Sequence, residues 1–81
     1  MICYKYKDGR YLKTSYMGDG EYELILTNEE ISRDCLFEKN WLLSDILGSC
    51  DSVYDDDGEY IADTLDEGDF ISQKTKIKIK N

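Results

Sequence analysis

Residues 1–27 have the sequence MICYKYKDGR YLKTSYMGDG EYELILT, and this stretch decides the predicted fold. Asp8-Gly9 and Asp19-Gly20 are both typical two-residue hairpin loops, because such loops need residues that tolerate a positive φ. The loops separate three alternating segments, which are Ile2 to Lys7, Arg10 to Met17 and Glu21 to Thr27. We therefore predict that the chain begins with a three-stranded antiparallel meander.

The two loops also set the register of the meander. A loop at Asp8-Gly9 pairs Tyr6 with Tyr11, and a loop at Asp19-Gly20 places Met17 near Tyr22. One face of the sheet then collects apolar side chains, namely Ile2, Tyr4, Tyr6, Tyr11, Met17, Tyr22, Leu24 and Leu26. The other face carries Lys5, Lys7, Arg10, Leu12, Tyr16, Glu21, Glu23 and Ile25. A slip of one residue would scatter the apolar set, so the alternation supports this register.

A helical region is expected after the meander. Thr27 and Glu30 have the spacing of a capping box, with Asn28 as an alternative cap. The apolar residues that follow at helical spacing are Ile31, Cys35 and Leu36, and then Trp41, Leu42, Leu43, Ile46 and Leu47, with Asn40 before the second group and Gly48 after it. The pattern leaves open one bent helix or two short ones. In either case we expect Trp41 to anchor the helix in the core.

The last third of the chain returns to strand patterns. Ser52 to Asp55 and Glu59 to Leu65 flank Asp57-Gly58, which predicts a C-terminal β-hairpin. Strict alternation follows from Ile71 to Ile79, with Lys74, Lys76, Lys78 and Lys80 on one face, and this predicts a lysine-rich strand. A length of 81 residues suits a single domain, residues 1–81. The expected fold class is α+β.

Charge is unevenly distributed along the chain. The net charge is −8, yet residues 14–73 alone carry −15. Residues 45–69 contain ten acids and no base. The simplest interpretation is a solvated face that keeps the protein soluble. The alternative is a negative surface that fits a basic groove on a partner, because ordered carboxylates can occupy sites built for phosphates.

Several function classes are disfavoured by the residues present. The chain has no histidine, and its three cysteines, Cys3, Cys35 and Cys50, form no CxxC pair, which disfavours zinc and nucleophilic catalysis. The Asp55-Asp57-Gly58 turn lacks the end ligands of an EF-hand, because Val53 and Thr64 occupy those positions. We expect no enzyme activity, no metal and no cofactor. Reduced thiols and the lack of a signal peptide or long apolar run favour a cytoplasmic protein without a membrane partner.

The expected partner is a basic protein, since an acidic body repels nucleic acid directly. The candidate partner-binding residues are acids in turns and on strand faces: Asp51, Asp55, Asp56, Asp57, Glu59, Asp63, Asp66, Glu67 and Asp69, with Glu21 and Glu23 as helpers. Along a strand, every second residue shares a face at a spacing of about 6.6 Å, so such acids can form rows.

The size, composition and acidic stretch at 45–69 resemble small phage-encoded anti-defence proteins, including anti-CRISPR proteins. The resemblance is one of class and carries over no functional residue. It implies a DNA mimic that inhibits a nucleic-acid-binding protein such as a host nuclease complex. The alternative hypothesis is a non-inhibitory interaction module or subunit. It would use exposed tyrosines and the lysine-rich edge strand, including homodimer formation by strand addition.

Overall fold

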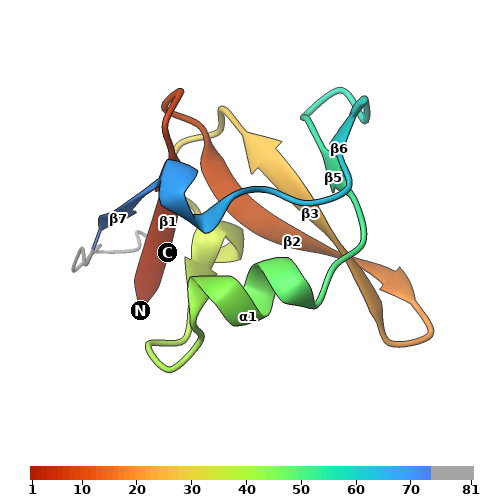
Figure 1. The fold of residues 1–81 in the computed structure, drawn as a ribbon, viewed down its shortest axis with the longest axis horizontal. Helices are drawn as coiled ribbons and strands as arrows, with labels where there is room; N and C mark the ends of the chain where they lie inside the picture. The colour runs from red at the N-terminus through yellow and green to blue at the C-terminus, as the bar shows by residue number, and fades with distance from the viewer. Residues whose placement is uncertain (74–81) are drawn as a thin grey trace.

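The computed structural model describes residues 1–73 and shows one mixed sheet of seven strands (Figure 1). These are β1 (Ile2–Tyr6), β2 (Tyr11–Gly18), β3 (Glu21–Thr27), β4 (Leu36–Phe37), β5 (Val53–Tyr54), β6 (Tyr60–Ala62) and β7 (Phe70–Gln73). The order across the sheet is β4-β1-β2-β3-β5-β6, and β7 pairs with β1. Neighbouring strands are antiparallel except β3 and β5, which are parallel. One short helix, α1 (Leu43–Gly48), and two 3-10 turns, η1 (Arg33–Cys35) and η2 (Glu67–Asp69), complete the described fold.

The loop between β1 and β2 is one residue longer than predicted. The Gly9 N–H donates to the Tyr6 carbonyl at 2.9 Å, and the Tyr6 N–H donates to the Arg10 carbonyl at 2.7 Å. The loop therefore has three residues and ends on Gly9 at φ 95°, where the left-handed conformation of a three-residue hairpin loop belongs. Lys5 consequently pairs with Tyr11, and the predicted pairing of Tyr6 with Tyr11 is wrong.

The second loop forms at Asp19-Gly20 as predicted, but a bulge shifts the register beyond it. Asp19 and Gly20 have φ values of 52° and 77°, and Gly18 pairs with Glu21 across the loop. The register then shifts between Tyr16 and Gly18, so that Tyr16 rather than Met17 pairs with Tyr22. A bulge of this kind inserts one extra residue into one strand of an antiparallel pair.

These two shifts reverse the predicted faces of β2. Leu12 pairs with Leu26 and is fully buried, whereas the prediction placed it on the outer face. Met17, predicted to face the core, is 55% exposed. The predicted core face is confirmed for Tyr4 of β1 and Leu24 of β3, which pack in one buried cluster with Leu12.

The predicted central helices are wrong for residues 27–42. The Thr27 hydroxyl accepts a hydrogen bond from Glu29 N–H at 3.1 Å, which closes a turn at the end of β3 and not a capping box with Glu30. The chain then forms only η1 and β4 before α1. Burial of Phe37 and pairing of β4 with β1 outweigh the short helical periodicity, because strand pairing gives the backbone N–H and C=O groups hydrogen-bond partners there.

α1 is the one helix among residues 1–73, and it is shorter than predicted. Leu43, Ile46 and Leu47 lie at helical spacing and are buried against the sheet. Asn40 does not cap it, because the N-cap position is Leu42 and has no side-chain hydrogen bond. Trp41 precedes the helix with 48% of its surface exposed, so its predicted role as the core anchor is wrong.

The C-terminal strands are present but short. β5 and β6 pair around the Asp57-Gly58 turn, and η2 lies between β6 and β7. β7 pairs with β1. The predicted lysine-rich strand begins at Ile71, which lies in β7, but its four lysines, Lys74 to Lys80, lie outside the described residues. The fold is therefore mostly β-sheet, and the predicted α+β class with central helices is wrong.

Candidate protein-binding surface

One face of the sheet is only partly covered by α1. The helix ends at Gly48, but the β2–β3 hairpin continues beyond it (Figure 1). On this uncovered part, Tyr16 and Tyr22 form a cross-strand aromatic pair with ring centroids 5.1 Å apart. Both rings are about half exposed, at 61% and 49%. Apolar surface therefore continues from the core on to the outside of the molecule.

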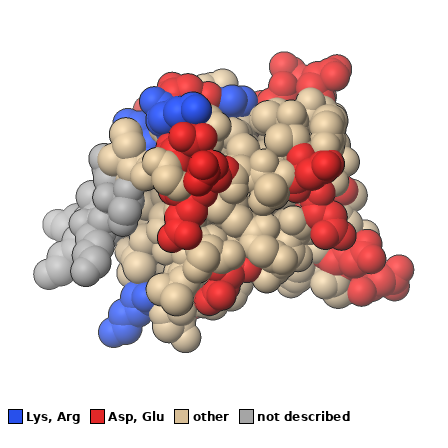
Figure 2. Space-filling view, viewed as in Figure 1, with Lys and Arg blue, Asp and Glu red and all other residues tan. Residues whose placement is uncertain are grey.

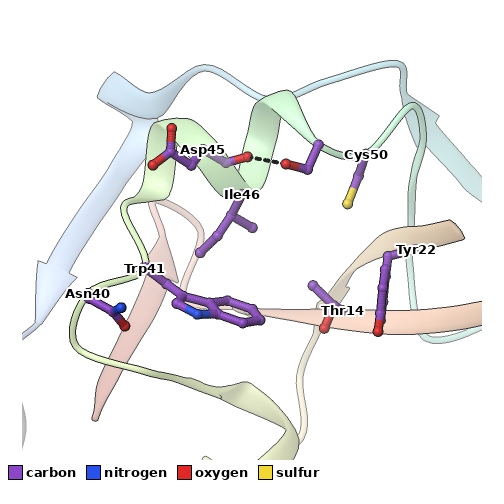
Figure 3. A pocket seen from close by; sticks show the side chains of 8 residues that line it. Thr14, Tyr22, Asn40, Trp41, Asp45, Ile46 and Cys50 are labelled. Carbon is purple, nitrogen blue, oxygen red and sulfur yellow. Dashed lines mark hydrogen bonds between the residues drawn. The ribbon is translucent and has the colours of Figure 1, made fainter. Parts of the chain in front are cut away.

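A groove of about 500 Å³ lies between α1 and this hairpin (Figure 3). Figure 3 shows the Trp41 indole below Ile46, with Tyr22 and Cys50 toward the other end of the groove. The full lining consists of Thr14, Tyr22, Asn40, Trp41, Asp45, Ile46, Ser49 and Cys50. Two half-exposed aromatic side chains thus face a cavity of the size that small ligands and partner side chains fill. Because the prediction assigned Trp41 to the core, it missed this groove.

Trp41 is fixed in place by packing against Phe37 and by a hydrogen bond to its backbone carbonyl. The Tyr4 hydroxyl donates to the Trp41 carbonyl at 2.8 Å. The Phe37 ring lies 5.7 Å from the Trp41 ring and 5.7 Å from the Tyr4 ring. Since Tyr4 and Phe37 belong to the buried core, Trp41 is presented from a rigid support.

Cys50 contributes an apolar wall to the groove. Burial raises the pKa of its thiol, and the negative charge of Asp51 raises it further. The thiol therefore stays protonated at neutral pH, where it behaves as a small hydrophobic group. The chemistry that this groove offers is noncovalent binding of an apolar group.

A second, acidic groove adjoins the first. It has a volume of about 330 Å³ and is lined by Met17, Gly20, Glu21, Tyr22, Glu23, Ser49, Asp51 and Ser52. Glu21 and Glu23 come from β3, and Asp51 comes from the segment that leads into β5. A hydrogen bond from Leu24 N–H to the Ser52 carbonyl, 3.0 Å, holds that segment beside β3. Three predicted site residues from distant parts of the sequence are thereby brought together.

Further predicted acids continue along the same edge of the sheet. β5 runs parallel to β3, and Asp56 beyond it accepts a hydrogen bond from Asn28 N–H, 2.8 Å, just past the end of β3. We call this set of side chains the acidic edge: Glu21, Glu23, Asp51, Asp55, Asp56, Asp57, Glu59 and Asp63. Figure 2 shows Asp and Glu gathered on this side of the molecule, at the right of the view.

Several of these carboxylates have structural partners. Asp55 Oδ1 accepts hydrogen bonds from the N–H groups of Asp57 and Glu59, both at 2.9 Å. Hydrogen bonds from the Thr27 side chain and the Asn28 N–H hold the pKa of Asp56 below its usual range. The prediction treated these acids as ligands for a partner, but these two also build the β5–β6 loop.

Asp63 also has a partner within the described residues. The Tyr60 hydroxyl donates a hydrogen bond to it, and this hydrogen bond raises the pKa of Tyr60. Asp63 therefore helps to hold the tyrosine of β6, in addition to adding charge to the acidic edge.

The remaining predicted acids lie at η2, beside the β1–β2 loop. Asp66 accepts a hydrogen bond from Gly68 N–H at 2.9 Å, and Glu67 lies in η2. Asp69 forms an ion pair with Lys7 at 3.2 Å, which raises the pKa of Lys7. The ten acids of residues 45–69 consequently do not form one surface.

The ion pairs within the described residues involve other carboxylates than those of the acidic edge, although Lys13 and Arg10 help to lower the pKa of Asp56. Arg10 pairs with Asp8 at 2.7 Å and Lys13 with Glu29 at 3.7 Å, in addition to the pair at η2. The Arg10 side chain holds the pKa of Asp8 below its usual range. None of the ion pairs found in residues 1–73 neutralises a carboxylate of the acidic edge.

No protein-family model, curated protein or solved structure matches this chain. Across residues 1–73, no three or more Cys, Asp or Glu side chains are arranged to hold a metal ion. No helix in the same part of the chain is long and apolar enough to cross a membrane.

Proposed function

We propose that this protein binds a basic surface of a nucleic-acid-binding protein and inhibits it by occupying the site of the nucleic acid. The acidic edge carries this proposal. Its eight carboxylates follow one side of the sheet, and within residues 1–73 none of them forms an ion pair with Lys or Arg. A surface of this kind attracts a basic groove over a long range and excludes nucleic acid from it.

The proposed partner is a protein such as a host nuclease complex, and the proposed setting is the cytoplasm. Three free, buried cysteines are in keeping with a reducing compartment. The proposal assigns the protein no catalytic role, no cofactor and no direct contact with nucleic acid. Glu21, Glu23 and Asp51 are the leading contacts, because all three line one groove and none accepts a hydrogen bond or forms an ion pair with another described residue.

The test is a pull-down from bacterial lysate at low and high salt, followed by a competition assay with labelled DNA. We expect capture of a nucleic-acid-binding protein, loss of capture at high salt, and release of that protein's DNA by the inhibitor. The variant E21Q/E23Q/D51N should lose capture. The matched control E30Q/D34N/E38Q removes the same charge from exposed positions outside the acidic edge and should keep it. Capture that survives salt and the first variant would refute mimicry.

A second candidate function is a non-inhibitory interaction module, which the exposed aromatic groove favours. Tyr16, Tyr22 and Trp41 are each about half exposed, and such residues often dominate protein interfaces. This candidate predicts capture that tolerates high salt and is lost in Tyr22→Ala. It includes homodimer formation by addition of strands at β6, which is one of the two end strands of the described sheet order.

A further inference from the structure

The apolar groove and the acidic groove adjoin each other. Both are lined by Tyr22 and Ser49, so the two grooves meet at these residues. The apolar groove is lined by Ile46 and Cys50, which are buried, and by the half-exposed Trp41. The acidic groove is lined by Glu21, Glu23 and Asp51.

Two further large apolar side chains near the grooves are exposed. Leu42, next to Trp41 in the sequence, is 59% exposed, and Met17, which lines the acidic groove, is 55% exposed. Single exposed apolar residues are ordinary, but several gathered around a cavity mark an interaction site. A partner that covers them gains free energy in proportion to the apolar area removed from water.

Charge decides which kind of partner fits. No Lys or Arg among residues 1–73 lines either groove, whereas four acidic residues do, three in the acidic groove and Asp45 in the apolar groove. Glu21, Glu23 and Asp51 do not converge closely enough to hold a metal ion. A spread set of carboxylates instead suits ammonium and guanidinium groups, which donate hydrogen bonds to several separate acceptors.

We propose that the two grooves bind a basic, amphipathic segment of a partner protein. An apolar side chain of that segment enters the groove between Trp41, Ile46 and Tyr22. A lysine or arginine within about three residues of it pairs with Glu21, Glu23 or Asp51, because neighbouring side chains of an extended chain span adjacent grooves. This inference rests on the proposed function, since the segment belongs to the basic partner, and it adds the apolar anchor that charge mimicry alone does not require.

Trp41 is the single tryptophan of the chain, so its fluorescence reports directly on the groove. The probes are two synthetic peptides, Lys-Arg-Lys-Leu-Lys-Arg-Lys and the same peptide with serine in place of leucine. They have equal charge and differ only in the anchor. We expect the leucine peptide to bind the full-length protein about tenfold more tightly or better, from burial of one leucine side chain. It should also shift the Trp41 emission to shorter wavelength, and the serine peptide should not.

Two exposed tyrosines provide the matched variants. Tyr22→Ala removes a wall shared by both grooves and should abolish the preference for leucine. Tyr60→Ala makes the same change on β6, at 54% exposure and outside both grooves, and should leave the preference intact. Because both side chains are about half exposed, neither variant is expected to unfold the protein.

Three outcomes would overturn the inference. Equal affinity for the two peptides without a change in Trp41 emission would mean that charge alone binds, which leaves the proposed function standing. Binding of neither peptide would refute the grooves as a site for basic segments, and the pull-down would still decide the proposed function. A shift in Trp41 emission with protein concentration alone would show that a second copy of this chain fills the groove.

Discussion

Asp55 and Asp57 lie two residues apart in the same acidic loop, yet we predict opposite consequences for removing them. The Asp55 carboxylate accepts backbone hydrogen bonds from Asp57 and Glu59, both at 2.9 Å. Asp57 is exposed, and within the described residues its carboxylate accepts no hydrogen bond. Replacing either residue with alanine removes one negative charge. Comparing the two variants therefore distinguishes the effect of the lost hydrogen bonds from the effect of the lost charge.

The expected magnitude follows from the two hydrogen bonds. Each contributes about 0.5–1 kcal/mol at a partly exposed site, so Asp55→Ala should lower the free energy of unfolding by about 1–2 kcal/mol. For a domain of this size that corresponds to a fall in Tm of roughly 4–16 °C. Asp57→Ala should change stability by less than about 0.5 kcal/mol, or raise it slightly by relieving repulsion between acids.

Thermal and urea unfolding followed by circular dichroism would measure both variants. Asp55→Asn is the third arm, because its amide oxygen can still accept the backbone hydrogen bonds and it should recover part of the loss. Equal destabilisation by the two alanine variants would refute the assignment of Asp55 as the residue that builds the loop. The same outcome would also mean that charge neutralisation, and not loop geometry, controls stability at this edge.

Three further predictions concern the fold. Gly9→Ala should cost about 1–2 kcal/mol of stability because Gly9 has φ 95°, whereas Gly48→Ala, in α1 without a positive φ, should be neutral or stabilising in the same urea titration. Leu12→Ala should cost about 2–5 kcal/mol by leaving a cavity at a fully buried site, and Tyr11→Ala should cost clearly less; the opposite ranking would restore the register expected for a two-residue first loop. Burial and the nearby Cys35 raise the pKa of Cys3 to about 11. Because the thiol ionises at lower pH in the unfolded chain, near pH 9, the contribution of Cys3 to the free energy of unfolding is fully present below about pH 9 and falls by about 3 kcal/mol between pH 9 and 11. Cys3→Ala should flatten that part of a pH–stability curve, and an unchanged slope would contradict the assignment.

The positions of the first three strands could be predicted from sequence, but their register could not. The Asp-Gly and Gly-Asp-Gly sequences predict where the chain reverses direction, and both reversals occur where they were expected. Whether such a turn has two residues or three, or carries a bulge beside it, depends on packing across the sheet. One extra residue in the first loop and one in the bulge moved Leu12 to the core, although no local signal at Leu12 distinguishes the two faces.

The helix prediction for residues 27–42 was wrong for a related reason. Cys35 and Leu36 fit a helical face, yet the pairing of β4 with β1 depends on a strand more than thirty residues away. Trp41 was misplaced because a tryptophan among leucines usually lies inside a small core. Here the core is already filled by Tyr4, Phe37 and the residues of α1, which leaves the indole at the surface.

Under the proposed function, the two parts of the surface would have different roles in binding. Long-range attraction from the acidic edge would mainly set the rate of association and its dependence on salt. Burial of an anchor beside Trp41 would act after contact and mainly slow dissociation. An acidic surface alone attracts many basic proteins, whereas a groove with a defined apolar lining accepts only those whose basic segment carries a suitable side chain at the right distance. Under the proposed function, selectivity for one target would therefore depend on the groove between α1 and the β2–β3 hairpin, and the acidic edge would set how fast that target is bound.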